Sequence, residues 1–408
     1  MRIAIVGTGV SGLVVAHHLH RHHDVTLFEA NGYIGGHVNT LALPVGNITH
    51  AIDTGFIVYN ERNYPQFAAL LAELGVPTQP TTMSFSMRSD RSGLEYNGSS
   101  LNQLFAQRRN LMRPAFYRML RDILRFNRDA PLAVARGDAA PTLGAYLDNG
   151  GFGPELARDY LIPMGSALWS IPPSRVLEMP TAFFVTFFDN HGMLATGARP
   201  QWRVVQGGSQ RYVDALVAPF RAAIRTHTAV TSVRRAVDHV QVNGERFDQV
   251  VLACHSDDAL ELLEDATRLE RELLGALPYQ QNDVVLHSDE TLLPRRRNAW
   301  GSWNYRIPGD ASAPAIVTYN MNMLQSLPGT ATFCVSLNAG DAINPGQVHR
   351  RLRYRHPVYT VAGMAAQRRR DEISVGRTHF CGAYWGNGFH EDGVRSALSV
   401  VARVMSAQ

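Results

Sequence analysis

The sequence predicts an α/β protein in which a Rossmann-like nucleotide-binding domain carries an inserted α+β domain, made of an antiparallel sheet plus helices. Three observations predict this architecture. A GxGxxG segment follows the first apolar strand, a proline-interrupted helical stretch covers residues 101–200, and strand-like runs return after residue 224. The chain of 408 residues, 45% hydrophobic, is long enough to bury the cores of two domains.

The first thirty residues have the pattern of a dinucleotide-binding βαβ unit. Residues 2–6 are an apolar strand, residues 7–12 read Gly-Thr-Gly-Val-Ser-Gly, and the strand 24–28 ends at Glu29. The glycines allow a tight turn and close approach to a pyrophosphate, which the following helix N-terminus attracts, and Glu29 can accept from a ribose hydroxyl. The residues expected to contact the dinucleotide here are Gly7, Gly9, Val10, Ser11, Gly12 and Glu29.

Several later segments narrow the dinucleotide. Residues 30–37 contain a Gly-Gly pair, 52–56 read Ile-Asp-Thr-Gly-Phe, 206–210 read Gln-Gly-Gly-Ser-Gln, and 228–233 are expected to form a strand. Together they resemble the flavoprotein family of amine oxidases, phytoene-type desaturases and protoporphyrinogen oxidases, so the resemblance implies FAD as the cofactor. That family usually has arginine after the Gly-Gly pair, where this chain has histidine. The FAD contacts that the resemblance adds are Ala30, Gly35, Gly36, His37, Gly55, Phe56 and, over the adenine, Val230.

The C-terminal segment is similar to the last FAD segment of the same family. Residues 378–383 are expected to form a strand that ends in small residues, and residues 391–398 begin the last helix. The resemblance implies that Gly382 lies by the ribityl-phosphate, and Gly393 and Val394 by the isoalloxazine, where N–H groups at the helix N-terminus stabilise the reduced flavin. The whole pattern is most similar to a bacterial subgroup associated with modified fatty acids.

Composition bears on several classes of function. The formal charge is only +4 and arginine is dispersed, which argues against nucleic acid as a partner. The first strand begins at once and no apolar run reaches transmembrane length, so we expect a cytoplasmic protein. We expect no metal, because the cysteines lack metal-ligand spacing and the histidines of residues 17–23 spread around a helix.

Lysine is absent, since all 39 residues counted as Lys or Arg are arginine. In much of the amine oxidase family, a lysine holds a water near flavin N5. That arrangement cannot exist in this chain, which argues against a true amine oxidase. No second GxGxxG occurs, so we expect electrons to leave to oxygen, a quinone or another protein rather than to come from a built-in NAD(P)H site.

The pattern of elements predicts the domain limits. A helix is expected over 63–74, a hairpin over 84–96 and a helix over 258–269. The strands of the antiparallel sheet are expected at 282–287, 299–306, 314–320 and 332–337. The predicted FAD-binding domain comprises residues 1–75, 201–265 and 366–408, and the predicted substrate-binding domain comprises residues 76–200 and 266–365.

Residues 104–128 have two interpretations. From Phe116 to Leu124 the apolar residues fall on one helical face, and seven arginines interleave with the segment. Such a basic amphipathic helix can lie on an anionic membrane surface and give access to lipid, which would make the protein peripheral at the inner membrane surface. Alternatively, it is a cap helix over the substrate domain with a solvated arginine face.

Candidate catalytic residues come from two places. By the resemblance, the loop 384–391 borders the isoalloxazine ring, so its aromatic side chains would wall the substrate cavity and His390 or Glu391 could move a proton. In the alternative interpretation, Glu391 caps the helix and His390 binds the cofactor. Trp303 lies on an alternating run that either lines the cavity or packs in the sheet. The candidates are Tyr384, His390, Glu391 and Trp303.

These observations indicate an FAD-dependent oxidoreductase, a desaturase or dehydrogenase that transfers a hydride from a hydrophobic substrate to flavin N5. The resemblance favours an unsaturated or methylated fatty acyl substrate, and no acidic pair suited to an ammonium group stands out. Three alternatives stay open. They are a carotenoid- or porphyrinogen-type oxidase, a flavin-dependent isomerase or mutase, and a non-catalytic flavoprotein partner of a lipid-modifying enzyme.

Overall fold

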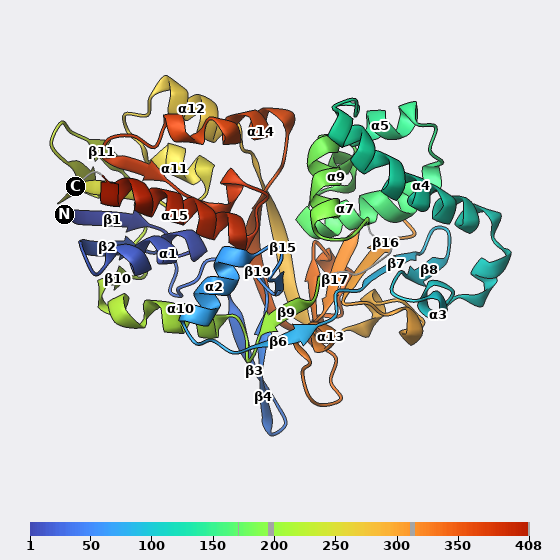
Figure 1. The fold of residues 1–408 in the computed structure, drawn as a ribbon. Helices are drawn as coiled ribbons and strands as arrows, with labels where there is room; N and C mark the ends of the chain where they lie inside the picture. Colours follow the sequence, from blue (N-terminus) through green and yellow to red (C-terminus); the bar gives the residue numbers. More distant parts are fainter. Residues whose placement is uncertain (170, 195–199, 311–314, 407–408) are drawn as a thin grey trace.

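A parallel sheet forms the nucleotide-binding part of the molecule. The computed structural model describes residues 1–169, 171–194, 200–310 and 315–406. The five strands of this sheet all run parallel, in the order β10 (Ile224–Arg225), β2 (Asp24–Phe28), β1 (Arg2–Val6), β14 (Gln249–Leu252) and β20 (Thr378–Phe380). Both chain termini lie at this end of the molecule (Figure 1).

Alternation along β1 divides the core between the two faces of this sheet. Ile3 and Ile5 pack in a cluster with α1 (Val10–Leu19), α10 (Gln210–Val217) and α15 (His390–Ser406). The intervening Ala4 and Val6 pack on the other face. That face is covered by β11 (Val233–Arg235), β12 (Val240–Val242), β13 (Glu245–Phe247), α11 (Ser256–Leu262), α12 (Arg268–Gly275) and α14 (Val361–Arg368). Both faces are covered, which explains the continuous apolar sequence of β1.

A seven-stranded mixed sheet forms the second large layer. Its order is β19 (Val348–Pro357), β15 (Tyr279–His287), β18 (Cys334–Leu337), β17 (Ile316–Asn320), β16 (Trp303–Ile307), β7 (Phe85–Ser89) and β8 (Leu94–Asn97). All neighbours are antiparallel except β16 and β7, which are parallel. The predicted antiparallel strands and the predicted hairpin are therefore present, but β16 begins at Trp303 rather than at residue 299. Residue 314, the first of the strand predicted over 314–320, lies outside the described residues. The edge strand β19 was not predicted.

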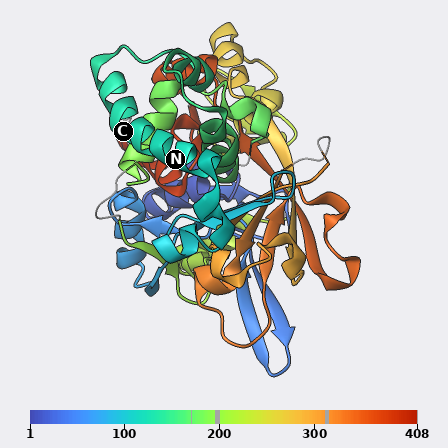
Figure 2. The same ribbon diagram turned by 90° about the vertical axis from the view of Figure 1, so that its right-hand side faces the viewer.

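A group of helices packs beside this sheet. It contains α4 (Pro114–Arg136), α5 (Leu143–Asn149), α7 (Ile162–Trp169) and α9 (Thr181–Asn190), whose buried side chains share one cluster. The helices lie together on one side of the seven-stranded sheet (Figures 1 and 2). The α/β fold class is thus confirmed, with a parallel Rossmann-like sheet and a mixed sheet accompanied by helices.

Several further strands and helices complete the fold. The strands are β3 (Thr40–Val45), β4 (Ile48–Asp53), β5 (Tyr59–Asn60), β6 (Thr78–Thr81) and β9 (Trp202–Val205). The helices are α2 (Pro65–Glu73), α3 (Leu101–Leu104), α6 (Pro154–Leu156), α8 (Pro173–Val176), α13 (Met321–Gln325) and the 3-10 helix η1 (Arg108–Met112). Among the described residues, no helix combines the length and apolarity needed to cross a bilayer. The domain limits given above stay a prediction.

Two predicted elements differ from the structure. Residues 228–232 are not a strand, because the side chain of Asn243 accepts hydrogen bonds from the backbone N–H groups of Thr231 and Ser232 and donates to the carbonyl of Ala229. Residues 258–269 are not one helix. The chain breaks after α11, and Thr267 starts α12 with a capping box.

Candidate active site

A cavity of about 720 Å³ is lined by residues from both large sheets. Its nucleotide end is formed by the loop after β1, the end of β2 and the residues around the Gly-Gly pair. The predicted site residues that line it are Gly7, Gly9, Val10, Ser11, Glu29, Ala30, Gly35, Gly36, His37, Gly55, Phe56, Val230, Trp303, Gly382, Tyr384 and His390. Gly12, Glu391, Gly393 and Val394 are outside this lining.

Close backbone packing shapes the glycine-rich loop. A Cβ on Gly12 would lie 2.1 Å from the carbonyl oxygen of Gly7, so only glycine fits there. Gly36, at φ +62°, lies so close that its Cβ would be 3.0 Å from the Cα of Gly9. On Gly9, by contrast, a Cβ would meet no described atom within 4 Å. The loop is therefore packed from behind and open toward the cavity, as a bound pyrophosphate requires.

Neighbouring donors hold Glu29 in place at the end of β2. Its carboxylate accepts from the backbone N–H of Thr8 at 3.1 Å, and from the backbone N–H and side-chain amide of Asn31 at 2.9 and 2.8 Å. The side chain is buried and lines the cavity. The hydroxyl of Thr8 also donates to this carboxylate, at 2.5 Å, so each oxygen has two donors. A ribose hydroxyl can take the place of the Thr8 hydroxyl, which is able to rotate away.

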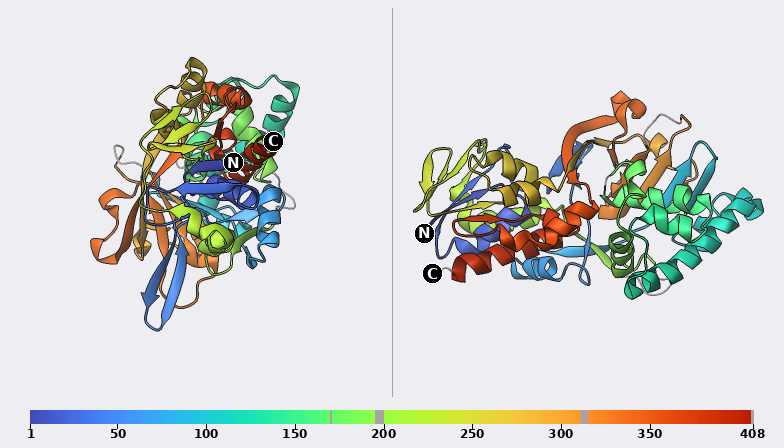
Figure 3. Two further views of the ribbon diagram at one scale, coloured as in Figure 1. Left: turned by 90° about the vertical axis from the view of Figure 1, so that its left-hand side faces the viewer. Right: turned by 90° about the horizontal axis from the view of Figure 1, so that it is seen from above.

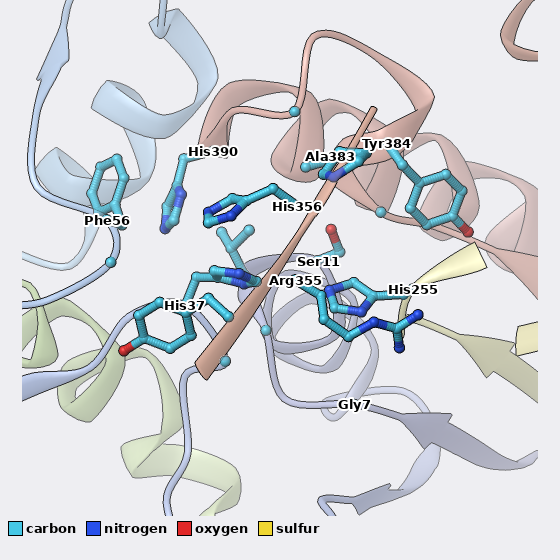
Figure 4. A pocket seen from close by; sticks show the side chains of 18 of the residues that line it. Gly7, Ser11, His37, Phe56, His255, Arg355, His356, Ala383, Tyr384 and His390 are labelled. Atoms are coloured by element: carbon cyan, nitrogen blue, oxygen red, sulfur yellow. The ribbon is translucent and has the colours of Figure 1, made fainter. Parts of the chain in front are cut away.

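His37 takes the place of the family's arginine and lies in a cluster of aromatic rings. The centre of its ring is 5.0 Å from that of Tyr354 and 5.3 Å from that of His356, and Figure 4 shows His356 beside His37. Burial, followed by the charges of His356 and His255, holds the pKa of His37 well below its usual value. Its buried Nε2 has no hydrogen-bond partner among the described residues. This nitrogen can therefore donate a hydrogen bond to the cofactor or accept one from it, depending on the tautomer of the ring.

Strand β19 also supplies Arg355, which sequence reasoning missed together with Tyr354 and His356. The guanidinium pairs with Asp257 and with Asp258, the latter at 2.6 Å. His255, Asp257 and Asp258 lie close enough to suggest a metal site. However, both carboxylates are engaged by Arg355, so we assign them to an ion pair. The alternating pattern of residues 348–357 is the signal that could have predicted this strand.

His390 is held against Phe56 at the other side of the cavity. The two rings stack with centres 3.5 Å apart, and the Nε2 of His390 lies 3.0 Å from the hydroxyl of Tyr212. Burial lowers the pKa of His390 to about 3, so the ring is neutral at physiological pH. Figure 4 shows Tyr384 away from this pair, on the side of His255. The structure therefore separates two residues that sequence analysis had placed in one group.

Glu391 points away from the cavity. Its carboxylate accepts from the backbone N–H groups of Gln66 at 3.2 Å and Phe67 at 3.0 Å, in the first turn of α2. It therefore caps a helix, but α2 rather than its own helix α15. The hypothesis that Glu391 moves a proton is not supported by this geometry, because both oxygens are used in a buried structural contact.

The start of α15 also differs from the prediction. The helix begins at His390, and the N–H of Gly393 already donates to the carbonyl of Phe389. The N–H of Val394 is therefore inside the helix, and the unpaired amides of the first turn are those of residues 390–392. Gly393 instead packs on the glycine-rich loop, where its carbonyl accepts from the hydroxyl of Ser11 at 3.0 Å. The predicted donor position is thus one turn too late.

The far end of the cavity is aromatic and carries little charge. It is lined by Met83, Leu168, Trp169, Phe187, Trp202, Trp303, Tyr319 and Tyr359. Trp303 packs edge-on against Tyr319 with ring centres 5.1 Å apart. Among the described lining residues, the carboxylates are those of Glu29, which directly follows β2, and of Asp258 and Glu261 in α11. The aromatic end therefore offers no acid to a substrate ammonium group.

Fold and cavity together define an FAD-binding oxidoreductase. The model of the flavin-containing amine oxidoreductase family matches residues 10–298, and the chain belongs to this family. Its fold is similar to that of cyclohexylamine oxidase from Brevibacterium oxydans IH-35A, with 17% identity, a TM-score of 0.70, and coverage of 100% of this chain and 99% of that chain.

Two further solved structures with other named activities have the same fold. The CLA-producing fatty acid isomerase from P. acnes is 15% identical, with a TM-score of 0.67 and 98% of each chain covered. Reduced UDP-galactopyranose mutase is 13% identical, with a TM-score of 0.68, covering 100% of this chain and 96% of that chain. At these identities the likeness concerns the fold, and the substrate has to be argued from the cavity.

Proposed function

We propose that this protein is an FAD-dependent desaturase or dehydrogenase that acts on a lipid-like hydrocarbon, with an unsaturated or methyl-branched fatty acyl chain as the favoured substrate. The observation that carries the proposal is the aromatic, acid-free end of the cavity. An amine substrate would be held best by a carboxylate, whereas an acyl chain gains from contact with aromatic and aliphatic side chains.

Residues of the chain would bind and orient the two reactants. Glu29, the glycine-rich loop and His37 hold the cofactor, which when bound supplies a hydride acceptor. Trp303, Phe187 and their aromatic neighbours exclude water and align the hydrocarbon. His390 stays neutral and fixed between Phe56 and Tyr212, which suits positioning better than proton abstraction, because a base with a pKa near 3 is weak.

The chain's lack of lysine supports the same proposal. Without lysine, the chain cannot place an ammonium group beside the flavin in the way much of the amine oxidase family does. The nearby buried donors are neutral, namely the indole N–H groups of Trp169 and Trp303 and the hydroxyl of Tyr359, none of which has a partner in the structure. Neutral donors in an apolar cavity can orient a carbonyl oxygen, such as that of an acyl ester, without requiring charge on the substrate.

Anaerobic reduction of the protein-bound flavin tests this function. Purified holoprotein is mixed with phospholipid-bound and free acyl chains, either cis-monounsaturated or methyl-branched, and separately with cyclohexylamine and putrescine. We expect the oxidised flavin to bleach as it takes a hydride from the acyl chain while a proton from the neighbouring carbon passes to solvent. The product is then lighter by two hydrogen atoms, as detected by mass spectrometry. Bleaching by the amines alone would overturn the proposal. Rearranged lipid with no net bleaching would favour the isomerase alternative, and tight binding to a lipid-modifying enzyme without turnover would favour the partner alternative.

A matched pair of variants links turnover to this cavity. Trp303→Ala removes a lining ring, whereas Trp300→Ala removes a tryptophan outside the lining, whose indole N–H donates to Pro294 at 2.8 Å. We expect a raised KM for the acyl substrate in the first variant only, when both are compared at equal FAD content. Equal kinetics in both variants would contradict substrate binding at the aromatic end.

A further inference from the structure

Exposed apolar side chains gather at one place on the helical side of the molecule. We call this place the η1 surface and define it by Leu101, Leu111, Met112, Tyr117, Arg108, Arg109 and Arg113. Met112 is 88% and Leu101 77% exposed, which is unusual for side chains of this size. The surface spans α3, η1 and the first turn of α4, at the end of the molecule opposite to both termini (Figures 1 and 3).

The amphipathic face predicted for α4 is a different set of residues, and most of it is buried, although Leu124 is 59% exposed. Phe116 and Met119 are 3% and 1% exposed and pack with Met87 and Tyr96 of the hairpin. This face therefore caps the sheet, as in the second interpretation of the sequence. The most exposed apolar side chains of the η1 surface, Met112 and Leu101, come instead from the segments that precede the helix.

Hydrogen bonds fix the backbone of the η1 surface. The side-chain amide of Asn110 donates to the carbonyl of Glu95 at 3.1 Å, and the hydroxyl of Tyr117 donates to the carbonyl of Leu111 at 3.0 Å. Arg113 donates to the carbonyl of Ser92 at 3.2 Å. These bonds tie the turn to the β7–β8 hairpin, so Leu111 and Met112 are presented to solvent on a rigid base.

The charge around these side chains is positive and unbalanced. The sequence has no acidic residue between Glu95 and Asp122. In the described part of the chain, Arg108, Arg109 and Arg113 donate to carbonyl or amide oxygens and to no carboxylate. Burial and the nearby charge of Arg109 lower the pKa of Arg113, which shows that the two cations repel each other. A negatively charged surface would relieve this repulsion.

We propose that the η1 surface docks on an anionic lipid bilayer, with Leu111 and Met112 in the apolar boundary and the three arginines at the headgroups. Exposed apolar side chains next to arginines suit the two layers of such a membrane. The apolar side chains can insert among the acyl chains, and the guanidinium groups can bind the lipid phosphates. The proposal does not depend on which substrate the cavity takes, and its test measures binding without turnover.

Co-sedimentation with vesicles tests the proposal on the full-length holoprotein. One vesicle is phosphatidylcholine alone, and the other is an equimolar mixture of phosphatidylcholine and phosphatidylglycerol. We expect binding to the mixed vesicles that weakens with added salt. Met112→Asp should reduce that binding by about tenfold, because a carboxylate replaces an inserted side chain beside anionic lipid. The matched control is Val237→Asp, at a 99% exposed valine between β11 and β12, which should bind like the native protein.

The charge contribution is tested separately with Arg109→Gln/Arg113→Gln, which should lower binding to the mixed vesicles and reduce its salt dependence. FAD content shows that each variant is folded. The proposal is overturned if native protein does not bind the mixed vesicles at low ionic strength, or if Met112→Asp binds as well as Val237→Asp. It is also overturned if native protein is a dimer and Met112→Asp a monomer, because a second copy then covers the surface.

Discussion

Replacing Glu391 tests whether this buried acid is structural or catalytic. Its carboxylate receives the N–H groups of Gln66 and Phe67, and it joins the start of α2 to the start of α15. In Glu391→Gln the amide oxygen can still accept one of these bonds, but the negative charge at the helix N-terminus is lost. In Glu391→Ala both N–H groups lose their partner in a buried place.

The expected magnitudes follow from these contacts. Glu391→Gln removes the charge and one hydrogen bond, which should lower the free energy of unfolding by about 1–2 kcal/mol. Glu391→Ala leaves both N–H donors unpaired, which should lower it by about 2–4 kcal/mol. The matched control is Glu61→Gln, because Glu61 is 70% exposed and lies 3.7 Å from Arg203 as its ion-pair partner. An exposed pair of this kind contributes less than about 1 kcal/mol.

Thermal release of FAD, followed by flavin fluorescence, is a suitable assay. The transition temperature should fall in the order control, Glu391→Gln, Glu391→Ala, by about 1–2 °C for each kcal/mol in a chain of this length. The visible spectrum of the bound flavin and its reduction by substrate should be unchanged at equal FAD content. A Glu391→Gln protein of native stability that cannot be reduced by substrate would refute the structural role and restore the catalytic one.

Three further outcomes are expected. Glu29→Ala should weaken FAD binding by about 1.5–3 kcal/mol, as measured by titration of apoprotein, because it removes a carboxylate that the ribose can share. Gly12→Ala should give a protein that retains little FAD after gel filtration, since its Cβ would lie 2.1 Å from the Gly7 carbonyl oxygen. Burial lowers the pKa of His379 from 6.5 to about 4, so the unfolded chain binds a proton that the folded protein excludes, and this stability is lost as the pH falls from about 6.5 toward 4. Between pH 6.5 and 4, the free energy of unfolding should therefore fall by about 3 kcal/mol less in His379→Gln than in the native protein, as measured by urea unfolding. An equal fall in both proteins would contradict a buried neutral histidine.

Much of the nucleotide-binding half could be predicted from local sequence. The β1 strand, the glycine-rich loop, α1, β2 and Glu29 follow one another within thirty residues, and each is specified by its own short pattern. The same holds for the β7–β8 hairpin and the start of α4 at Pro114, where turn residues and proline act within a few positions. Local backbone preferences and periodicity are sufficient there, since no distant contact has to be known.

Other features depended on contacts between distant residues. Glu391 was assigned to catalysis or to its own helix, but its oxygens meet α2, more than 300 positions away. His37 could be recognised as a substitution for arginine, yet its neighbours Tyr354 and His356 come from the edge strand β19. The direction of such side chains is set by how helices and strands pack, and that is decided by burial of the whole core.

By itself, the sequence determined the fold class and the FAD cofactor, and it predicted many of the residues at the nucleotide end of the cavity. These residues lie in short segments whose glycines and apolar strand runs are typical of a dinucleotide-binding fold. Only the tertiary structure decided that Glu391 is a helix cap, that His390 is held neutral against Phe56, and that Met112 is exposed while Phe116 and Met119 of α4 are buried. Each of these features depends on which surfaces of the two sheets and the helices pack against one another. The free energy of that packing comes from residues that are far apart in the chain.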